Sequence, residues 1–228
     1  MPAAEPRQYI VRVWDLPTRA FHWLLAACAI GSFVTAKIGG NAMAWPFRLG
    51  YAVLALLLFR LLWGFVGGRW SRFGHFVRSP ATLARYLRGD ARPGDAFDVG
   101  HNPLGALSVL AMLVFFAAQA ATGLFADDEI ANTGPLIRFV SGATSLRLTH
   151  YHKAVGEVVL IVLVVLHLLA LAWYTWRGRN LVFAMIGGDQ AFDREVPGAA
   201  GCARQRLLAL GLVAACAAGV AWLVSLGG

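Results

Sequence analysis

Cysteine, lysine and charged residues in general are scarce in this 228-residue chain. The three cysteines, Cys28, Cys202 and Cys216, are too few and too scattered for a disulfide framework, and we interpret them as reduced and structural. Charged residues make up 14% of the chain, against about 25% in soluble domains, while hydrophobic residues make up 58%. This composition excludes a disordered tail and a disulfide-stapled secreted module, and makes an integral membrane protein the first hypothesis.

Several cofactor motifs are also missing. No Cys-x-x-Cys-His sequence occurs, which excludes covalent c-type haem on this chain. Neither a P-loop nor a Gly-x-Gly-x-x-Gly pattern follows a strand, and grouped cysteines for an iron–sulfur cluster are lacking. The net charge of +8 reports membrane topology, and no nucleic-acid partner is expected.

Five stretches are apolar and long enough to cross a bilayer, which needs roughly 20 helical residues. None alternates with period two, so we predict helices rather than barrel strands. The predicted fold is an all-α integral membrane protein, a four-helix transmembrane bundle followed by a fifth C-terminal transmembrane helix. The predicted spans are residues 20–36, 49–68, a stretch within 99–126, about 154–176, and 207–228.

Positive charge is unevenly distributed over the connections. The N-terminal segment and the second and fourth connections carry 14 Lys and Arg residues, whereas the first and third carry five. Because positively charged short loops resist translocation, we predict a cytoplasmic N-terminus and, with five spans, a C-terminus on the opposite, periplasmic side.

The remaining segments are connections. The cytoplasmic loop 77–98 contains Pro and Gly and a predicted short helix at 81–87, and loop 127–149 is the main periplasmic feature. Residues 9–188 form the predicted four-helix domain, 189–206 a flexible cytoplasmic linker, and 207–228 an additional helix.

Histidines inside the predicted spans are functional candidates, because imidazole in hydrocarbon is rare. His152 and His167 lie about 60° apart around the fourth span and ~22 Å apart along it, which suits two stacked haems. His22 lies in the same half of the bilayer as His167, so this pair is predicted to hold one haem between facing helices. His150 is about 100° from His167 and is expected to precede the helix. The alternative for each histidine is a helix cap, an interhelical hydrogen bond or a headgroup contact.

Two further residues are candidates for cofactor binding. Arg60 lies inside the second span and needs an anion, which a haem propionate would supply with bidentate geometry; the alternative is snorkelling to the interface. His101 begins the third span, and three roles stay open for it: a haem ligand, a contact to a propionate or quinone, or a helix start. His75 is expected to be solvated in the cytoplasmic loop.

The motifs around these residues resemble a known family. They are VWDLPTRAFHW at 13–23, FRLLWGFVG at 59–67, GHNPLG at 100–105 and HKAVG at 152–156, continuing to His167. They resemble the bacterial cytochrome b561 and nickel–iron-hydrogenase cytochrome b family of di-haem membrane proteins, over roughly residues 9–188. The resemblance implies a four-helix bundle, b-type haems, and electron transfer between the quinone pool and a redox partner. That partner would be a periplasmic cytochrome c or a dehydrogenase or hydrogenase subunit.

One position departs from the family pattern. The family usually has a histidine at the periplasmic start of the second helix, four residues before a glycine, and here that position holds Pro46. His152 then lacks its expected partner. Three outcomes remain open: the periplasmic haem is absent, it is five-coordinate, or a residue such as His150 or Met43 completes it. The haem on His22 and His167 does not depend on this position.

The expected function is therefore that of an electron carrier more than a stand-alone enzyme, because bis-histidine iron has no open position for a substrate. Hydroquinone would dock near the membrane interface, with His101 and Glu157 as candidate contacts. The alternative is an oxidoreductase whose exposed haem reacts directly with superoxide, oxygen or ferric ion, which Pro46 favours. A haem-free scaffold or transporter would leave the spacing of His152 and His167 unexplained.

Overall fold

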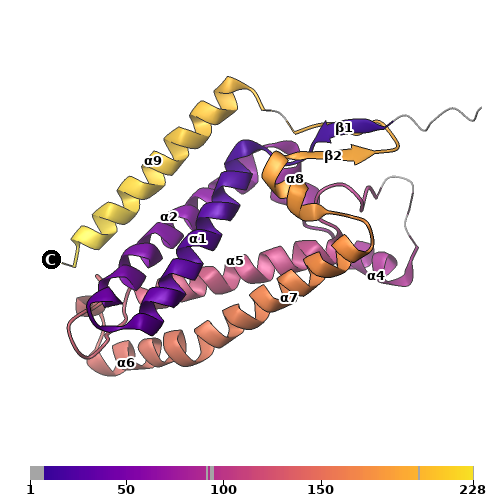
Figure 1. Ribbon diagram of the computed structural model, residues 1–228. Coiled ribbons are helices and arrows are strands. Elements are labelled where there is room, and N and C mark those ends of the chain that lie inside the picture. Colours follow the sequence, from indigo (N-terminus) through magenta and orange to yellow (C-terminus); the bar gives the residue numbers. More distant parts are fainter. Residues whose placement is uncertain (1–7, 91, 93–94, 200, 228) are drawn as a thin grey trace, which may run out of the picture.

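The computed structural model describes residues 8–90, 92, 95–199 and 201–227, and most of them are helical (Figure 1). Five helices are long and apolar enough to cross a membrane, which confirms the predicted all-α, multi-pass membrane fold. They are α1 (Leu16–Ile38), α2 (Ala44–Val66), α5 (Pro103–Gly123), α7 (Glu157–Trp176) and α9 (Ala203–Ser225). Residue 228, the predicted end of the fifth span, lies outside the described residues, as do residues 91, 93–94 and 200 of the predicted loop and linker.

Polar caps followed by proline set where two of these helices begin. Asp15 accepts a hydrogen bond from the Thr18 backbone N–H at 2.8 Å, and α1 therefore starts at Leu16, before the predicted boundary at residue 20. Asn102 caps α5 in the same way, through the Gly105 N–H at 2.7 Å. A capping oxygen satisfies an orphan amide of the first turn, and proline fits there because its missing N–H would have no partner.

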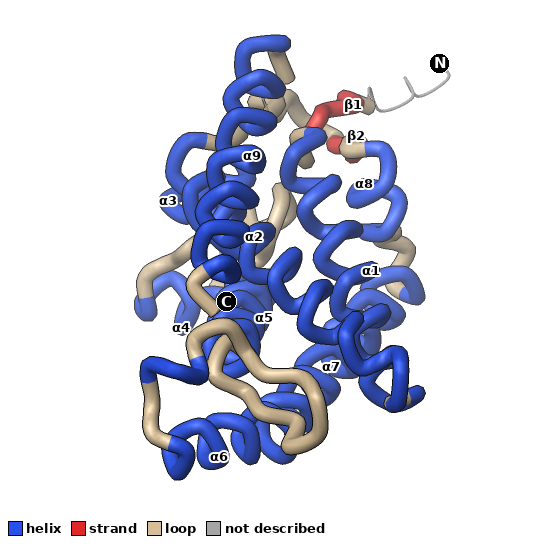
Figure 2. Tube along the Cα trace, turned by 90° about the vertical axis from the view of Figure 1, so that its left-hand side faces the viewer, coloured by secondary structure: helices blue, strands red, loops and turns tan. Residues whose placement is uncertain are grey.

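The helices pack in the order α1–α2, α2–α5 and α5–α7, and α9 lies along α2 (Figure 2). A buried apolar cluster joins α1, α2 and α9, and consists of Phe21, Phe59, Trp63, Ala209 and Cys216. The fifth helix thus buries side chains against the four-helix bundle. In Figure 1 the α1–α2 pair and the α5–α7 pair lie close at one end and diverge toward the other.

The fourth span is longer than predicted. Helix α6 (Gly142–His150) continues through a π-helical turn (Tyr151–Gly156) into α7, so helix runs without a break from Gly142 to Trp176. The prediction that His150 precedes the helix is therefore wrong, because His150 is the last residue of α6. Single π-helical turns are rare and are often found at functional sites, and this one carries His152.

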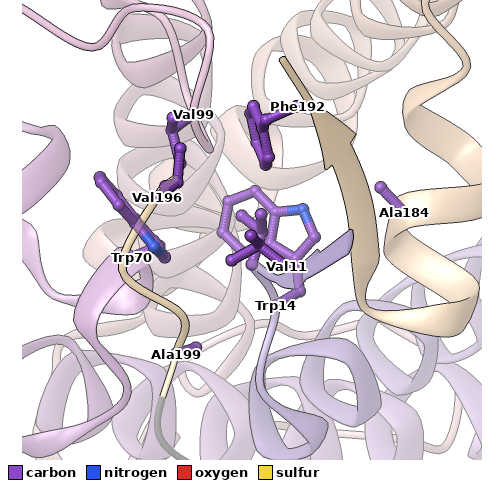
Figure 3. Close-up of a cluster of buried hydrophobic side chains, with 9 residues drawn as sticks. Val11, Trp14, Trp70, Val99, Ala184, Phe192, Val196 and Ala199 are labelled. Atoms are coloured by element: carbon purple, nitrogen blue, oxygen red, sulfur yellow. The ribbon is translucent and has the colours of Figure 1, made fainter. Parts of the chain in front are cut away.

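A small cap covers the end of the bundle where the helix pairs diverge. Strand β1 (Tyr9–Arg12) pairs antiparallel with β2 (Asp189–Phe192), and α8 (Leu181–Gly187) precedes β2. We call these three elements the cap, the end beside them the cap end, and the opposite end, where α6 lies, the loop end (Figure 1). A buried cluster holds the cap to the bundle (Figure 3), and includes Val11, Trp14, Trp70, Val99 and Phe192.

The segment predicted as a flexible linker is partly folded into this cap. Residues 189–192 form β2, and Val196 and Ala199 are buried in the same cluster as Trp14. Sequence reasoning missed the strand because its pairing partner, β1, lies at the other end of the chain.

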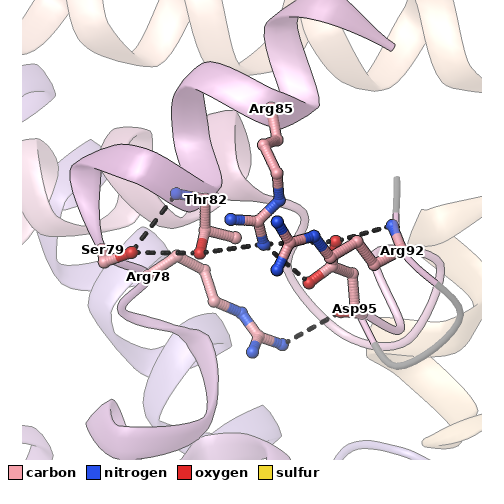
Figure 4. Close-up of polar contacts among 6 residues, drawn as sticks. All are labelled: Arg78, Ser79, Thr82, Arg85, Arg92 and Asp95. Carbon is pink, nitrogen blue, oxygen red and sulfur yellow. Dashed lines mark hydrogen bonds and ion pairs between the residues drawn. The ribbon is translucent and has the colours of Figure 1, made fainter. Parts of the chain in front are cut away.

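The loop between α2 and α5 contains the predicted short helix. Helix α4 (Pro80–Arg88) covers the predicted range 81–87 and is capped by Ser79. Asp95 joins α4 to the rest of the loop, since it pairs with Arg85 at 3.1 Å and accepts the Arg92 N–H at 2.9 Å (Figure 4). That backbone hydrogen bond, followed by the charge of Arg85, lowers the pKa of Asp95.

Candidate functional site

Two histidines from helices that are far apart in sequence meet inside the bundle. His22 lies two turns into α1 and His167 lies in α7, and their ring centroids are 6.5 Å apart with the planes inclined at 53°. Because a metal–imidazole bond is about 2 Å long, two rings that share one iron atom have centroids roughly 6 Å apart. The Nδ1 atom of His22 is buried without a hydrogen-bond partner. The spacing of the two rings fits an iron ion held between them.

Arg60 of α2 is buried, and it is one of the groups that act electrostatically on His101, together with His167 and His22. Its side chain is 3% exposed, and its Nη1 atom has no hydrogen-bond partner. The guanidinium lies 5.1 Å from the ring centroid of Phe73 and 5.8 Å from that of Phe76, both in the short helix α3 (Phe73–Phe76). Among the described residues no carboxylate forms an ion pair with it. The predicted alternative of snorkelling is wrong, because this side chain does not reach the surface; a buried cation with free donors suits an anionic ligand group.

His101 lies just before α5 in an aromatic setting. Its ring centroid is 4.7 Å from that of Trp14 and 5.1 Å from that of Phe76, and its Nδ1 atom is buried without a partner. Burial, with a smaller contribution from the Arg60 charge, lowers the pKa of His101 to about 3, so the imidazole is neutral. Asn102 serves as the helix cap of α5, which leaves His101 free to contact a ligand.

His75 is more buried than predicted. It is half-buried in α3 with its ring centroid 6.1 Å from that of Trp70, rather than free in solvent. Burial, and then the charges of Arg69, Arg72 and Arg78, lower the pKa of His75.

His152 lies at the loop end, in the π-helical turn. Its Nδ1 atom is 3.0 Å from the Gln119 carbonyl oxygen and 3.1 Å from the Thr122 hydroxyl, both on α5. A proton on Nδ1 donated to the carbonyl leaves the lone pair on Nε2, and histidines that bind metals are held in this way. An added Cβ at Gly123 would lie 3.2 Å from the His152 ring, so the glycine makes room for it. In the tautomer with the proton on Nδ1, the Nε2 atom of His152 would be available to a metal ion.

A second imidazole is not found beside His152 among the described residues, in contrast to the His22 and His167 pair. Pro46 lies in the first turn of α2, where proline costs little. His150 is exposed, and a side chain two residues away on one helix points about 200° around from His152, so these two cannot share an iron ion. Met43 lies half-buried in the short 3₁₀ segment Gly40–Met43 before α2.

Sequence reasoning missed a buried carboxylate beside the site. Asp15 is 2% exposed and accepts hydrogen bonds from the Trp63 indole at 3.2 Å, the Gly68 amide at 3.0 Å and the Ser71 hydroxyl at 2.9 Å, besides capping α1. It therefore joins the start of α1, which carries His22, to the end of α2, which carries Arg60. The Asp-Leu-Pro-Thr sequence was a readable signal, since an Asp before proline marks a helix start.

We expect Asp15→Ala to lower the melting temperature of the solubilised protein. Removing the carboxylate leaves several buried donors without an acceptor, at about 1–3 kcal/mol for each such group. Asp90→Ala, which removes an exposed carboxylate at the end of α4, is the matched control and should melt like the wild type. Equal melting of all three proteins in differential scanning fluorimetry would show that Asp15 does not anchor the helices.

A helical membrane bundle that brings two half-buried imidazoles from different helices to a centroid distance of 6.5 Å fits the class of membrane b-type cytochromes. The family model described as prokaryotic cytochrome b561 matches residues 13–188 of this chain. The protein therefore belongs to that family. Membership of the family implies electron transfer and haem b as the cofactor.

Curated relatives agree with this assignment. The chain is 26% identical over 145 residues to a probable Ni/Fe-hydrogenase 1 B-type cytochrome subunit of Escherichia coli strain K12, and equally to that of Escherichia coli O157:H7. The match covers 51% of this chain and 60% of each relative. No solved structure matches the chain.

Proposed function

We propose that the protein transfers electrons between the quinone pool and a redox partner, through a b-type haem held by His22 and His167. The observation that carries the proposal is the 6.5 Å separation of these two rings, each from a different membrane helix. When bound there, the haem supplies a reversible one-electron couple. If His22 and His167 both held the iron, no site for a substrate would remain on it, so the chemistry that the haem would supply is electron transfer.

Arg60 and His101 are proposed to hold the haem propionates. Arg60 brings a buried positive charge with an unused donor, and His101 brings a neutral imidazole with an unused nitrogen. A guanidinium suits a carboxylate because it can donate two parallel hydrogen bonds. The aromatic rings of Phe73 and Phe76 exclude water from this contact and strengthen its electrostatics.

The orientation in the membrane follows from charge. The segments at the cap end carry most of the arginines, so we propose that this end faces the cytoplasm of a bacterium and that the protein lies in the inner membrane. The C-terminus of α9 is then periplasmic. The redox partner would be a cytochrome c or a dehydrogenase or hydrogenase subunit. The name of the Escherichia coli relatives suggests the hydrogenase.

The number of haems is tested by pyridine haemochrome analysis of the purified full-length chain. One haem per chain would come from the His22 and His167 pair alone, and two would mean that His152 binds a second. Reduction of the haem by a short-chain quinol in nanodiscs would support electron transfer with quinone. Wild-type protein without any Soret absorption would exclude the proposed function.

A second candidate function has one specific observation in its favour, which is that His152 faces no second imidazole. A haem held by His152 alone would keep one coordination position open and could react with oxygen, superoxide or ferric ion. Rapid carbon monoxide binding by the reduced protein, lost in His152→Ala, would support this function. A reduced protein that does not bind carbon monoxide would leave the closed electron carrier.

A further inference from the structure

The two helices that carry the proposed iron ligands are not packing neighbours. Contacts between helices run from α1 to α2, from α2 to α5 and from α5 to α7, whereas α1 and α7 make at most sparse contacts within the described residues. The ring centroids of His22 and His167 nevertheless lie 6.5 Å apart. The helix pairs that carry these two residues diverge toward the cap end (Figure 1). Something other than direct packing must therefore set the distance between these helices.

The cap provides such a connection. Helix α8 follows α7 after residues 177–180, and its last carbonyl groups accept hydrogen bonds from the start of α1. The Arg19 guanidinium donates to the Ile186 carbonyl, and the Trp23 indole N–H donates to the Met185 carbonyl at 3.3 Å. The carbonyls at the end of a helix lack partners within the helix, and they attract positive charge. Arg19 and Trp23 flank His22, so they tie its helix to the continuation of the helix that carries His167.

Backbone bonds one residue further on complete the connection. The Gly188 carbonyl accepts from the Val13 and Trp14 amides at 2.8 and 3.1 Å. Gly188 has φ = 93°, a left-handed conformation that favours glycine, and an added Cβ would lie 2.8 Å from the Trp14 carbonyl oxygen and 3.2 Å from Arg19 Nε. A side chain at this position would therefore push α1 away from α8.

At the loop end, the interaction that joins α1 to α7 is weaker than the one at the cap end. Lys37, in the last turn of α1, pairs with Glu157, the first residue of α7, at 2.6 Å, but the Lys37 side chain is 57% exposed. Exposed ion pairs contribute little, because water screens them and the side chains lose freedom. The separation of α1 and α7 near His22 and His167 depends chiefly on the cap end.

We propose that Arg19, Trp23 and Gly188 form a clamp that presets the distance between His22 and His167 before the haem binds. These three are positioning residues, and the inference rests on the proposed function, since it assigns the imidazoles to iron. A site held ready in this way loses less conformational freedom on binding. A haem held by both rings would tolerate little widening, so release of the clamp should weaken the hold of one imidazole while both histidines remain beside the haem.

The test compares the full-length double variant Arg19→Met/Trp23→Phe with the full-length chain that lacks these two substitutions. Both substitutions keep side-chain bulk and remove the donors. We expect the variant to retain haem, to show a high-spin ferric component in absorption and EPR spectra, and to bind carbon monoxide about tenfold faster at the cap-end haem. Both proteins carry the additional substitution His152→Ala, so that only the His22 and His167 site is read. Lys37→Met in the same background is the matched control and should keep a low-spin spectrum.

Single variants keep the test decisive if the double variant does not fold. Trp23→Phe alone should give a smaller high-spin fraction, and Gly188→Ala should give the same spectrum by displacing α1 rather than by removing a donor. A folded double variant with a wild-type low-spin spectrum and wild-type carbon monoxide binding would overturn the clamp.

A measurement without haem separates failure of the clamp from failure of the proposed function. Spin labels at the exposed positions Leu24 of α1 and Leu169 of α7, in a chain with its three cysteines replaced by alanine, report the helix separation in haem-free protein. We expect a narrow distance distribution in wild type and a broad, longer one in the double variant. Absence of haem in the wild type would reject the proposed function, whereas equal distributions in both proteins would reject the clamp.

Discussion

Replacing either His22 or His167 by alanine is expected to remove one haem from each chain. The two ring centroids lie 6.5 Å apart, and loss of either imidazole would leave the haem held by one histidine in place of two. Pyridine haemochrome analysis and the Soret band of purified protein measure the loss. External imidazole should restore part of the six-coordinate spectrum, because it can occupy the space that the side chain leaves.

The matched control for these variants is His150→Ala. His150 is exposed at the end of α6, so its removal should leave the haem content unchanged. Full haem content in both His22→Ala and His167→Ala would contradict the assignment of this pair.

The substitution Arg60→Gln is expected to have opposite effects on the haem-loaded and haem-free protein. With haem bound, loss of a charge-assisted pair with a propionate should speed haem transfer to apomyoglobin by about tenfold or more. Without haem, removal of a buried and unpaired cation should leave the protein at least as stable as the wild type. The measurements are the rate of haem transfer and the melting temperature of each form.

Arg88→Gln provides the control for net charge. Arg88 is exposed at the end of α4, and its replacement changes the total charge equally without touching the site. A purely structural role for Arg60 would lower the stability of the haem-free protein and leave the rate of haem transfer unchanged.

The residues tested by these two predictions are held in place by contacts between different helices. Arg60 is held by rings of α3, and α2 is joined to α1 through the buried carboxylate of Asp15. The cap then joins α1 to α7. Every residue proposed to touch the haem at the cap end is thus positioned by contacts between segments that are distant in the chain.

The sequence alone determined the class of the protein and the residue types of its site. Hydropathy over about 20 residues decides whether a helix can span a bilayer, and this property is local, so five spans were predicted correctly. The helical period is also local, and it indicated which of the histidines could face the interior of a bundle. The motifs around His22 and His167 pointed to the family that the comparison confirmed.

Only the tertiary structure decided which residues meet. The pairing of β1 with β2, the π-helical turn at His152 and the burial of Arg60 all depend on partners far away in sequence, which periodicity does not report. Pro46 could be read as a missing histidine, but only the folded chain shows that His150 points away from His152. The physical reason is that helix formation follows from neighbouring residues, whereas the distance between two helices is set by the side chains and hydrogen bonds that join them.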